Sequence, residues 1–220
     1  MCYNGIHETD SRRRREGAGG CCYQRTTETR ERDMQETLKQ TSGSRGSSQV
    51  YFLTITAVLV ALTYIFTAFV NVRLPIAANG GLIHLGNVPL FLGAMIYGKK
   101  TGMIAGGVGM GLFDLLSGWT MWAPFTLVIV GLMGYTVGRM TERHRNLVWR
   151  TLAVIVACVI KVVGYYLTEV ILYGNWAAPL SSIPGNLVQI GVAAVIVLPI
   201  VGRLDVILRR MAPVDPGIEE

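Results

Sequence analysis

The chain has 220 residues, of which 51% are hydrophobic and only 15% are charged. A soluble domain carries about 25% charged residues, so this chain has too few to cover a surface in water. The net charge of +6 does not indicate nucleic-acid binding, because the basic residues lie in an N-terminal tail and at the ends of apolar segments, as in membrane proteins. Composition therefore predicts a multi-pass membrane protein.

Residues 1–49 form a polar tail that is rich in Arg, Glu, Gly, Ser and Thr. The tail has no apolar periodicity and lacks the apolar segment of a secretory signal, so we expect a disordered cytoplasmic segment. Met34 is a possible true start of translation. Three of the four cysteines lie in the tail and Cys158 lies in an apolar segment. Their spacing suggests neither a zinc site nor a disulfide framework, and no cofactor is expected.

The first predicted membrane helix covers residues 50–70, and a loop with Arg73, Pro75 and the sequence ANGG follows it. On this helix Ala57 and Ala61 form an A-x-x-x-A pair, which creates a face of small residues. Such a face either packs tightly inside the bundle or docks another membrane subunit. The spacing alone leaves both interpretations open.

The second and third predicted helices cover residues 82–98 and 101–117. The segment GAMIYGKKT, residues 93–101, almost matches a phosphate-binding loop, but it has Lys100 where the motif needs a hydroxyl, and its middle is apolar. ATP would therefore be hydrolysed by another subunit. The segment GMIAGGVGMG, residues 102–111, lies within a predicted span, where close glycines favour helix packing over nucleotide binding.

The last three predicted helices cover residues 122–139, residues 150–173, and a segment that starts near Pro184 and runs toward Arg209 and Arg210. Ser182 is a plausible cap for the last helix, and Pro199 predicts a kink in it. We therefore expect an all-α membrane protein with six helices over residues 50–210, followed by a short C-terminal tail at 211–220. Six crossings place both termini on one side of the membrane.

Basic residues identify that side. The connections after the second and fourth helices and the end of the sixth helix are basic, whereas the opposite side holds only Arg73. By the positive-inside rule both termini are cytoplasmic, and the connections 1–2, 3–4 and 5–6 face outward. The basic residues that fix this orientation are Lys99, Lys100, Arg139, Arg143, Arg145, Arg150, Arg203, Arg209 and Arg210.

Three charged residues, Asp114, Lys161 and Glu169, lie inside predicted spans. Each costs about 3 kcal/mol at the bilayer centre, so each should face the bundle interior, a cavity or another of the three. Lys161 could pair with Asp114 or Glu169 as a structural contact. Whether Glu169 meets a ligand or Lys161 stays open.

Polar and aromatic side chains also gather at the predicted outward ends of the helices. An interfacial belt would explain the aromatic residues but not an acid, an imidazole and several amides beside them. Polar groups that converge among aromatic walls are typical of a small-molecule pocket. The candidate substrate-binding residues are His84, Asn87, Trp119, Trp122, Tyr166, Glu169, Asn175, Asn186 and Gln189.

The stretch LIHLGNVPLFLGAMIYGKKTGMIAGGVGMGLFDLLSGWTMWAPFTLVIVGLMGYTVGRM, together with GYYLTEVILYGNWAAPLSSIPGNLVQ, resembles the S component, the substrate-binding membrane subunit, of energy-coupling factor (ECF) vitamin transporters. The resemblance covers about residues 50–210 and is closest to hydroxymethylpyrimidine- or pyridoxine-type members. It implies a pocket near the outer face of the plasma membrane. It also implies docking of Ala57 and Ala61 on a transmembrane scaffold that carries two ABC-type ATPases. One departure is Val130, near which many relatives carry a basic residue.

The leading hypothesis is therefore a transport subunit without enzymatic activity that binds a small heteroaromatic vitamin or vitamin precursor. Trp119, Trp122 and Tyr166 would stack on the ring, and the acid, imidazole and amides would bond its polar edge. Two alternatives remain open. One is a membrane-embedded enzyme acting on a lipid or isoprenoid, and the other is an assembly subunit without a ligand.

Overall fold

The computed structural model describes residues 48–73 and 82–211. The chain divides into two units, Met1–Tyr51 and Phe52–Glu220, and the helix bundle is formed by the second unit. The predicted tails at residues 1–49 and 211–220 lie almost wholly outside the described residues, so the domain boundaries stay predictions.

Six α-helices are described, and each overlaps a predicted span. Four of the helical segments are long and apolar enough to cross a membrane: Ser48–Ala68, Ala123–Arg143, Leu147–Tyr173 and Ala178–Leu208. The other two helices are shorter or more polar, so the count of six crossings stays a prediction. The helices are Ser48–Ala68, α2 (Asn87–Tyr97), α3 (Lys99–Leu116), α4 (Ala123–Arg143), α5 (Leu147–Tyr173) and α6 (Ile183–Met211), with the 3-10 helix η1 (Ala178–Ser182) before α6.

A short β-hairpin adds one small element to the predicted helical architecture and corrects the predicted start of the second helix. Strands β1 (Asn71–Arg73) and β2 (Leu82–His84) pair antiparallel, with Asn71 opposite His84 and Val72 opposite Ile83. The β-branched Val72 and Ile83 suit a strand. The helix predicted over 82–98 begins only at Asn87, after Gly86, and it holds Pro89 in its first turn, where proline is tolerated.

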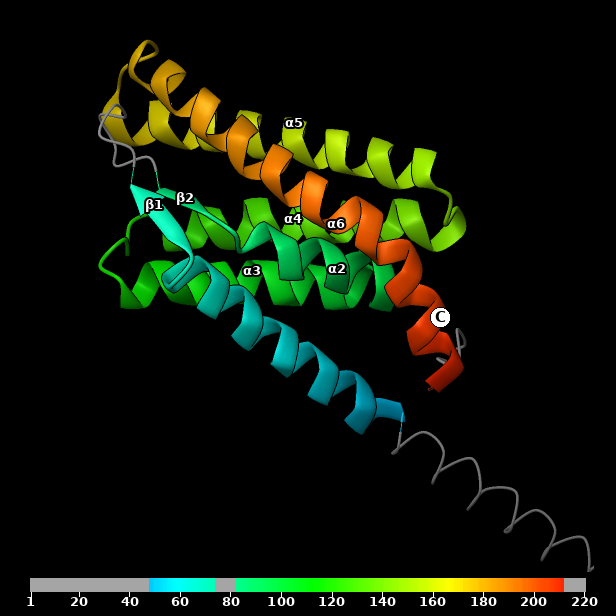
Figure 1. Cartoon of the computed structure of the whole chain (residues 1–220). Helices are drawn as coiled ribbons and strands as arrows, with labels where there is room; N and C mark the ends of the chain where they lie inside the picture. Colours follow the sequence, from blue (N-terminus) through cyan, green and yellow to red (C-terminus); the bar gives the residue numbers. More distant parts are fainter. Residues whose placement is uncertain (1–47, 74–81, 212–220) are drawn as a thin grey trace, which may run out of the picture. The chain divides into compact units, whose positions relative to one another are not determined.

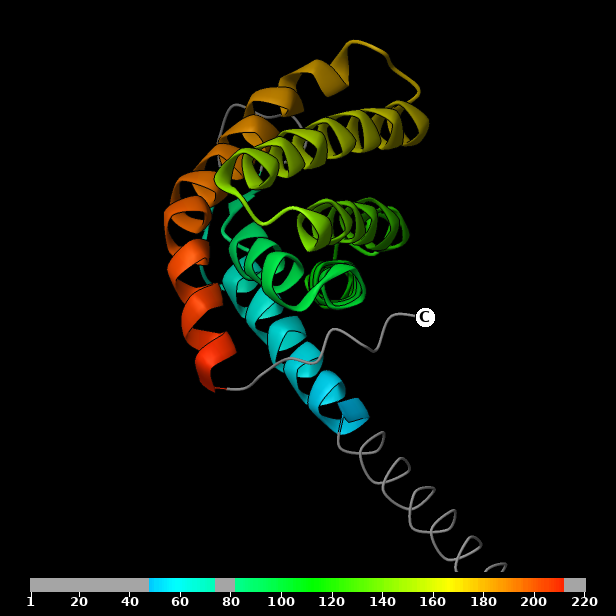
Figure 2. The ribbon, with the colours of Figure 1, turned by 90° about the vertical axis from the view of Figure 1, so that its right-hand side faces the viewer.

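Helices α3 and α4 make the most extensive helix contact, and they lie side by side in Figures 1 and 2. Their backbones touch: a Cβ on Gly134 of α4 would collide with the carbonyl of Gly102 in α3. Small residues allow this approach in a membrane, as expected for residues 102–111. Those residues lie inside α3, so their interpretation as a packing segment is confirmed.

Helix α2 lies at the centre of the packing, against α3, α4 and α6. Its Leu90, Phe91 and Ala94 are fully buried and meet fully buried residues of α4 and α6, such as Val130 and Val197. Helix α6, which contains Pro199, curves along its length (Figure 2).

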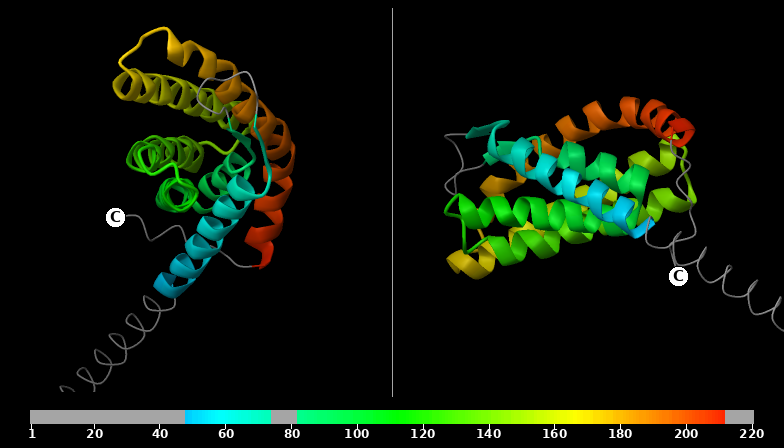
Figure 3. Two further views of the ribbon diagram at one scale, coloured as in Figure 1. Left: turned by 90° about the vertical axis from the view of Figure 1, so that its left-hand side faces the viewer. Right: turned by 90° about the horizontal axis from the view of Figure 1, so that it is seen from below.

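The helix Ser48–Ala68 crosses α2 and α3, as the view from below shows (Figure 3). Its inward face carries Thr56, Leu59, Thr63 and Thr67, all buried. The side chain of Leu59 packs against Gly93 of α2, and that of Thr63 packs against Gly109 of α3. Ala57 and Ala61 lie on the opposite, exposed face, so they do not form the packing surface of this helix within the chain.

The two ends of the bundle differ in chemistry. At one end, the hairpin end, lie β1–β2, the α3–α4 turn at residues 117–122 and the α5–α6 connection at 174–182 (Figure 1). At the other, the arginine end, lie Gly98 between α2 and α3, the α4–α5 loop at 144–146 and the last turns of α6. Most of the predicted site residues lie at the hairpin end.

Candidate functional site

A buried lysine is the centre of the polar groups near the hairpin end. Lys161 of α5 is 2% exposed, and its Nζ donates a hydrogen bond of 2.6 Å to Oε1 of Gln189 in α6. The same ammonium lies 5.8 Å from the ring centroid of Tyr165, which is within cation–π range. The charges of Lys161 and Asp114 also interact.

Among the described residues, Lys161 forms no ion pair within 4 Å with Asp114 or with Glu169. Pairing of Lys161 with an acid is one of the interpretations left open by the sequence; at contact distance its Nζ instead donates to the amide oxygen of Gln189. An ammonium has three N–H donors, and Gln189 accepts from one of them. The other N–H groups of Lys161 therefore also point into the interior of the bundle.

Aromatic rings stand beside the lysine. The ring centroid of Trp122 lies 6.3 Å from that of Tyr165 and 6.3 Å from that of Tyr173. The hydroxyl of Tyr165 donates to Oγ1 of the buried Thr126 at 3.2 Å. The structure therefore places Tyr165, rather than Tyr166, next to Trp122, and these mutually tilted rings form an apolar surface with a polar edge.

Glu169 and Asn186 meet through Ser182. The Ser182 hydroxyl donates to Oε2 of Glu169 at 2.7 Å, and Nδ2 of Asn186 donates to the Ser182 carbonyl at 3.2 Å. Glu169 is buried although its side chain ends in a carboxyl group. This contact ties the end of α5 to the start of α6, and it uses the serine that the sequence offers as a helix cap.

His84 and Asn87 flank the turn between β2 and α2. The backbone N–H of Gly86 donates to Nδ1 of His84 at 3.3 Å, so the neutral ring carries its proton on Nε2. His84 is half-buried by its exposed surface, but its ring lies deep among the surrounding atoms. This loss of water, helped by the Lys161 charge, lowers the pKa of His84 to about 3. Asn87 is fully buried, and neither its Nδ2 nor its Oδ1 has a hydrogen-bond partner.

Three predicted site residues have contacts in the loops of the hairpin end. The Tyr166 hydroxyl donates to the Trp176 carbonyl at 2.9 Å, and Oδ1 of the exposed Asn175 accepts from the Ala177 N–H at 2.8 Å. The carbonyl of Trp119 accepts from the Trp122 N–H in the α3–α4 turn. These contacts shape the connections and do not join the three residues to Lys161.

Sequence reasoning missed Tyr165, Thr126 and Lys161 as members of the site. The signal was present in α5, because Lys161, Tyr165 and Glu169 are spaced four apart and therefore share one helical face. Thr126 carries no comparable signal, since a threonine in an apolar helix usually bonds to its own backbone.

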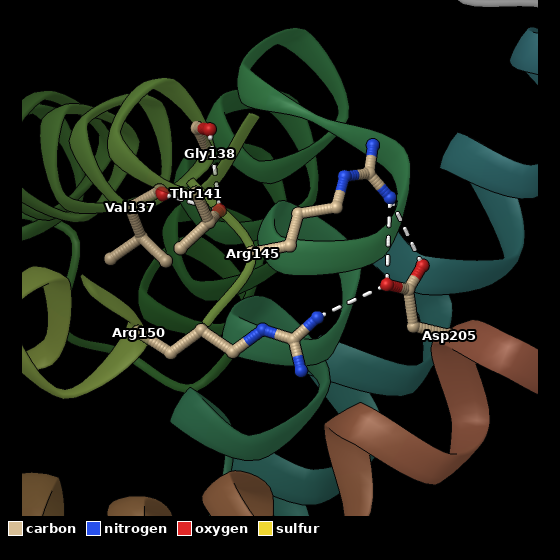
Figure 4. Close-up of polar contacts among 6 residues, drawn as sticks. All are labelled: Val137, Gly138, Thr141, Arg145, Arg150 and Asp205. Carbon is tan, nitrogen blue, oxygen red and sulfur yellow. Dashed lines mark hydrogen bonds and ion pairs between the residues drawn. The ribbon is translucent and has the colours of Figure 1, made fainter. Parts of the chain in front are cut away.

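A second polar cluster lies at the arginine end, where the sequence predicted no site (Figure 4). Asp205 of α6 accepts from Nη2 of Arg150 at 3.1 Å and from Nη1 of Arg145 at 3.2 Å. Arg150 is 5% exposed and Asp205 is 7% exposed. The cluster ties the α4–α5 loop and α5 to the last turns of α6.

Known proteins resemble the chain over most of the unit Phe52–Glu220. Residues 47–205 match the model of a family described as the ECF-type riboflavin transporter, S component. The thiamine precursor transporter HmpT of Lactococcus lactis subsp. cremoris (strain MG1363) is 27% identical over 158 residues, which are 70% of this chain and 90% of that protein. An uncharacterized protein in a gap 3' region of Pyrococcus woesei is 36% identical over 107 residues, 49% of this chain and 72% of that protein. These matches confirm the resemblance seen in the sequence.

Proposed function

Because the chain belongs to the ECF-type riboflavin transporter S-component family, we propose that it binds a small heteroaromatic vitamin or vitamin precursor at the outer face of the membrane. The substrate would be hydroxymethylpyrimidine, pyridoxine or a similar compound. As a member of this family the chain is a subunit of a transporter in the plasma membrane and not an enzyme. Uptake would occur together with an ATP-driven ECF module.

The observation that supports this proposal best is the buried polar group around Lys161. An ammonium, a neutral imidazole, amides and an acid lie near aromatic rings toward the hairpin end of the bundle. Buried polar groups in a membrane protein are costly and usually functional. Trp122 and Tyr165 would stack on the ring of the substrate, and Glu169, His84, Asn87 and Gln189 would bond its edge.

The names of the relatives narrow the substrate class. The family name refers to riboflavin, and HmpT is a thiamine precursor transporter. Both names denote compounds with flat nitrogen heterocycles, which suit aromatic walls with hydrogen-bonding groups at their edges. The proposal for this chain is therefore the ring class, and the pyrimidine or pyridine type is preferred within it.

The exposed alanine pair supports the proposed coupling. Ala57 and Ala61 face away from the chain on the helix Ser48–Ala68, where a scaffold subunit could approach closely. Two ABC-type ATPases on that scaffold would supply the energy. Six crossings with both termini in the cytoplasm would place the hairpin end outside and the arginine end inside.

Mass spectrometry of the compound that co-purifies with the full chain tests the proposal, followed by calorimetric titration of the stripped protein. We expect an unmodified heteroaromatic compound that rebinds with at least micromolar affinity. A ligand released in altered form would indicate the membrane-enzyme alternative. Failure of riboflavin, pyridoxine and hydroxymethylpyrimidine all to bind would reject the proposal in favour of an assembly subunit.

A further inference from the structure

Asn87 stands out in the described part of the chain because its whole side-chain amide is buried without a partner. Both Nδ2 and Oδ1 lack hydrogen bonds, and the residue is 0% exposed. The other side chains with unpartnered buried atoms, Thr56, Thr63 and Arg150, leave one atom unpaired each. A buried polar group without a partner destabilises the fold, so its presence calls for an explanation outside the folded chain itself.

The position of Asn87 brings it to the polar groups of the hairpin end. It lies in the first turn of α2, one turn before Leu90 and Phe91, which are fully buried in the core. Residues three and four apart share a helical face, so Asn87 belongs to the same inward face as these two. His84, whose ring interacts with the charge of Lys161, lies three residues before it. Asn87 is thus a fully buried residue in the first turn of α2, directly after the hairpin.

The chemistry of the unpaired amide restricts what could satisfy it. A carboxamide presents a C=O acceptor and an N–H donor side by side in one plane. A ring edge that carries an N–H donor next to a nitrogen or oxygen acceptor matches both atoms at once. Asparagine recognises the amino group and adjacent ring nitrogen of adenine in this bidentate way.

We infer that Asn87 is the residue that selects the ring, and that the substrate carries an adjacent donor and acceptor on its edge, as an aminopyrimidine does. This inference rests on the proposed function and narrows it. A pyridine whose nitrogen has no neighbouring N–H would accept from the N–H of the amide but would leave the amide C=O without a donor. A site built to form a hydrogen bond discriminates strongly against an analogue that lacks the matching group.

The test measures binding to the purified full chain with two matched pairs of probes. The first pair is 4-amino-5-hydroxymethyl-2-methylpyrimidine and the same compound with hydrogen in place of the amino group. The second pair is riboflavin and 3-methylriboflavin, in which the donor beside the carbonyls is blocked. We expect the wild type to bind the intact member of one pair at least 30-fold more tightly, and Asn87→Leu to reduce that ratio below threefold.

A stability measurement separates recognition from a structural role. Asn87→Leu removes an unpartnered amide, so the ligand-free variant should melt at or above the temperature of the wild type. Thr56→Val, which removes another unpartnered buried group far from the hairpin end, should leave the affinity ratio unchanged. Asn87→Asp, which replaces the N–H₂ donor by a carboxyl oxygen, is a second variant whose melting curve is measured alongside, and it should also lose discrimination.

The outcomes distinguish the two proposals. Failure of every ring to bind the wild type rejects both the proposed function and this inference. Tight ring binding with an unaltered ratio in Asn87→Leu and Asn87→Asp overturns this inference alone. A lower melting temperature of ligand-free Asn87→Leu also overturns it, because the amide would then be stabilising the fold.

Discussion

Nζ of Lys161 and Oε1 of Gln189 lie 2.6 Å apart and join α5 to α6 inside the bundle. Lys161 is 2% exposed and Gln189 is 6% exposed. A neutral amide does not cancel the charge of the ammonium at this contact, and the carboxylate of Asp114 lies near enough for the two charges to interact. Substitutions at these charged residues therefore affect the fold as well as the site.

Lys161→Met should destabilise the protein because it leaves Asp114 without the nearby cation. Loss of one partner of a contacting buried charge pair costs about 3–5 kcal/mol, and we expect less in this case because Lys161 and Asp114 are not in contact and Asp114 is only partly buried. Thermal unfolding in detergent measures the effect. The double variant Lys161→Met/Asp114→Asn should recover part of the loss. Strictly additive losses would show that the two charges are independent.

Glu169→Gln should weaken vitamin binding at least tenfold and leave folding intact. The amide oxygen can still accept from Ser182, but a charge-assisted bond to the ligand would be lost, and such bonds are about twice as strong as neutral ones. Calorimetric titration measures the affinity. Ser182→Ala is the control, because it removes the hydroxyl and keeps the carboxylate. Equal affinities of Glu169→Gln and wild type would remove Glu169 from the site.

Ala57→Trp or Ala61→Trp should abolish vitamin uptake by cells while the purified protein still binds its ligand. The bulky ring would hold the proposed scaffold subunit away from this exposed face. Leu62→Trp, on the flank of the same helix, is the matched control and should keep uptake. If uptake and binding were lost together in the alanine variants, the face would serve the fold of this chain and not docking.

Asp205→Ala should cost about 3–5 kcal/mol of stability, because it leaves the buried Arg150 guanidinium without its carboxylate. Arg145→Ala should cost about 1 kcal/mol or less, since the Arg145 side chain is 39% exposed. Denaturant or thermal unfolding of the purified variants measures both. Similar costs for the two variants would mean that burial does not set the strength of these ion pairs.

His84 should make the protein less stable as the pH falls from 7 to 4. Its pKa is lowered from 6.5 to about 3 in the folded chain, so in this range the unfolded state binds the additional proton. Stability is therefore lost as the pH drops through the unfolded value of about 6.5. Melting curves of wild type and His84→Gln across this range measure the contribution, and the variant should show a shallower slope. Parallel slopes would contradict the assignment.

The apolar runs of the sequence predicted the approximate position of each described α-helix, because apolar segments of about 20 residues are typical of membrane helices. They failed at residues 82–84, where Leu82 and Ile83 suit a membrane helix and a strand equally well. Only pairing with Asn71–Arg73, a contact between separate segments, decides in favour of the strand. The composition of residues 82–84 alone does not predict that pairing.

The positions of the candidate residues around their helices could not be predicted from the sequence for a related reason. Glu169 and Gln189 are buried as expected, yet Tyr166 and Tyr165 are adjacent in sequence and differ by about 100° around the helix. Helical periodicity alone could not tell which of the two faces Trp122. The pair Arg150 and Asp205 lies 55 residues apart and gives no sign in the sequence at all.

The contact of Gly102 with Gly134 has a mechanical consequence. Where two backbones touch directly, no side chain can change rotamer to let the helices slide, so α3 and α4 form a stiff two-helix plate. At the contact of α4 with α5 the side chain of Ile129 packs against Gly164, and this side chain can change rotamer. Any opening that admits a ligand to Lys161 would therefore swing α5, α6 or the hairpin against a fixed α3–α4 plate.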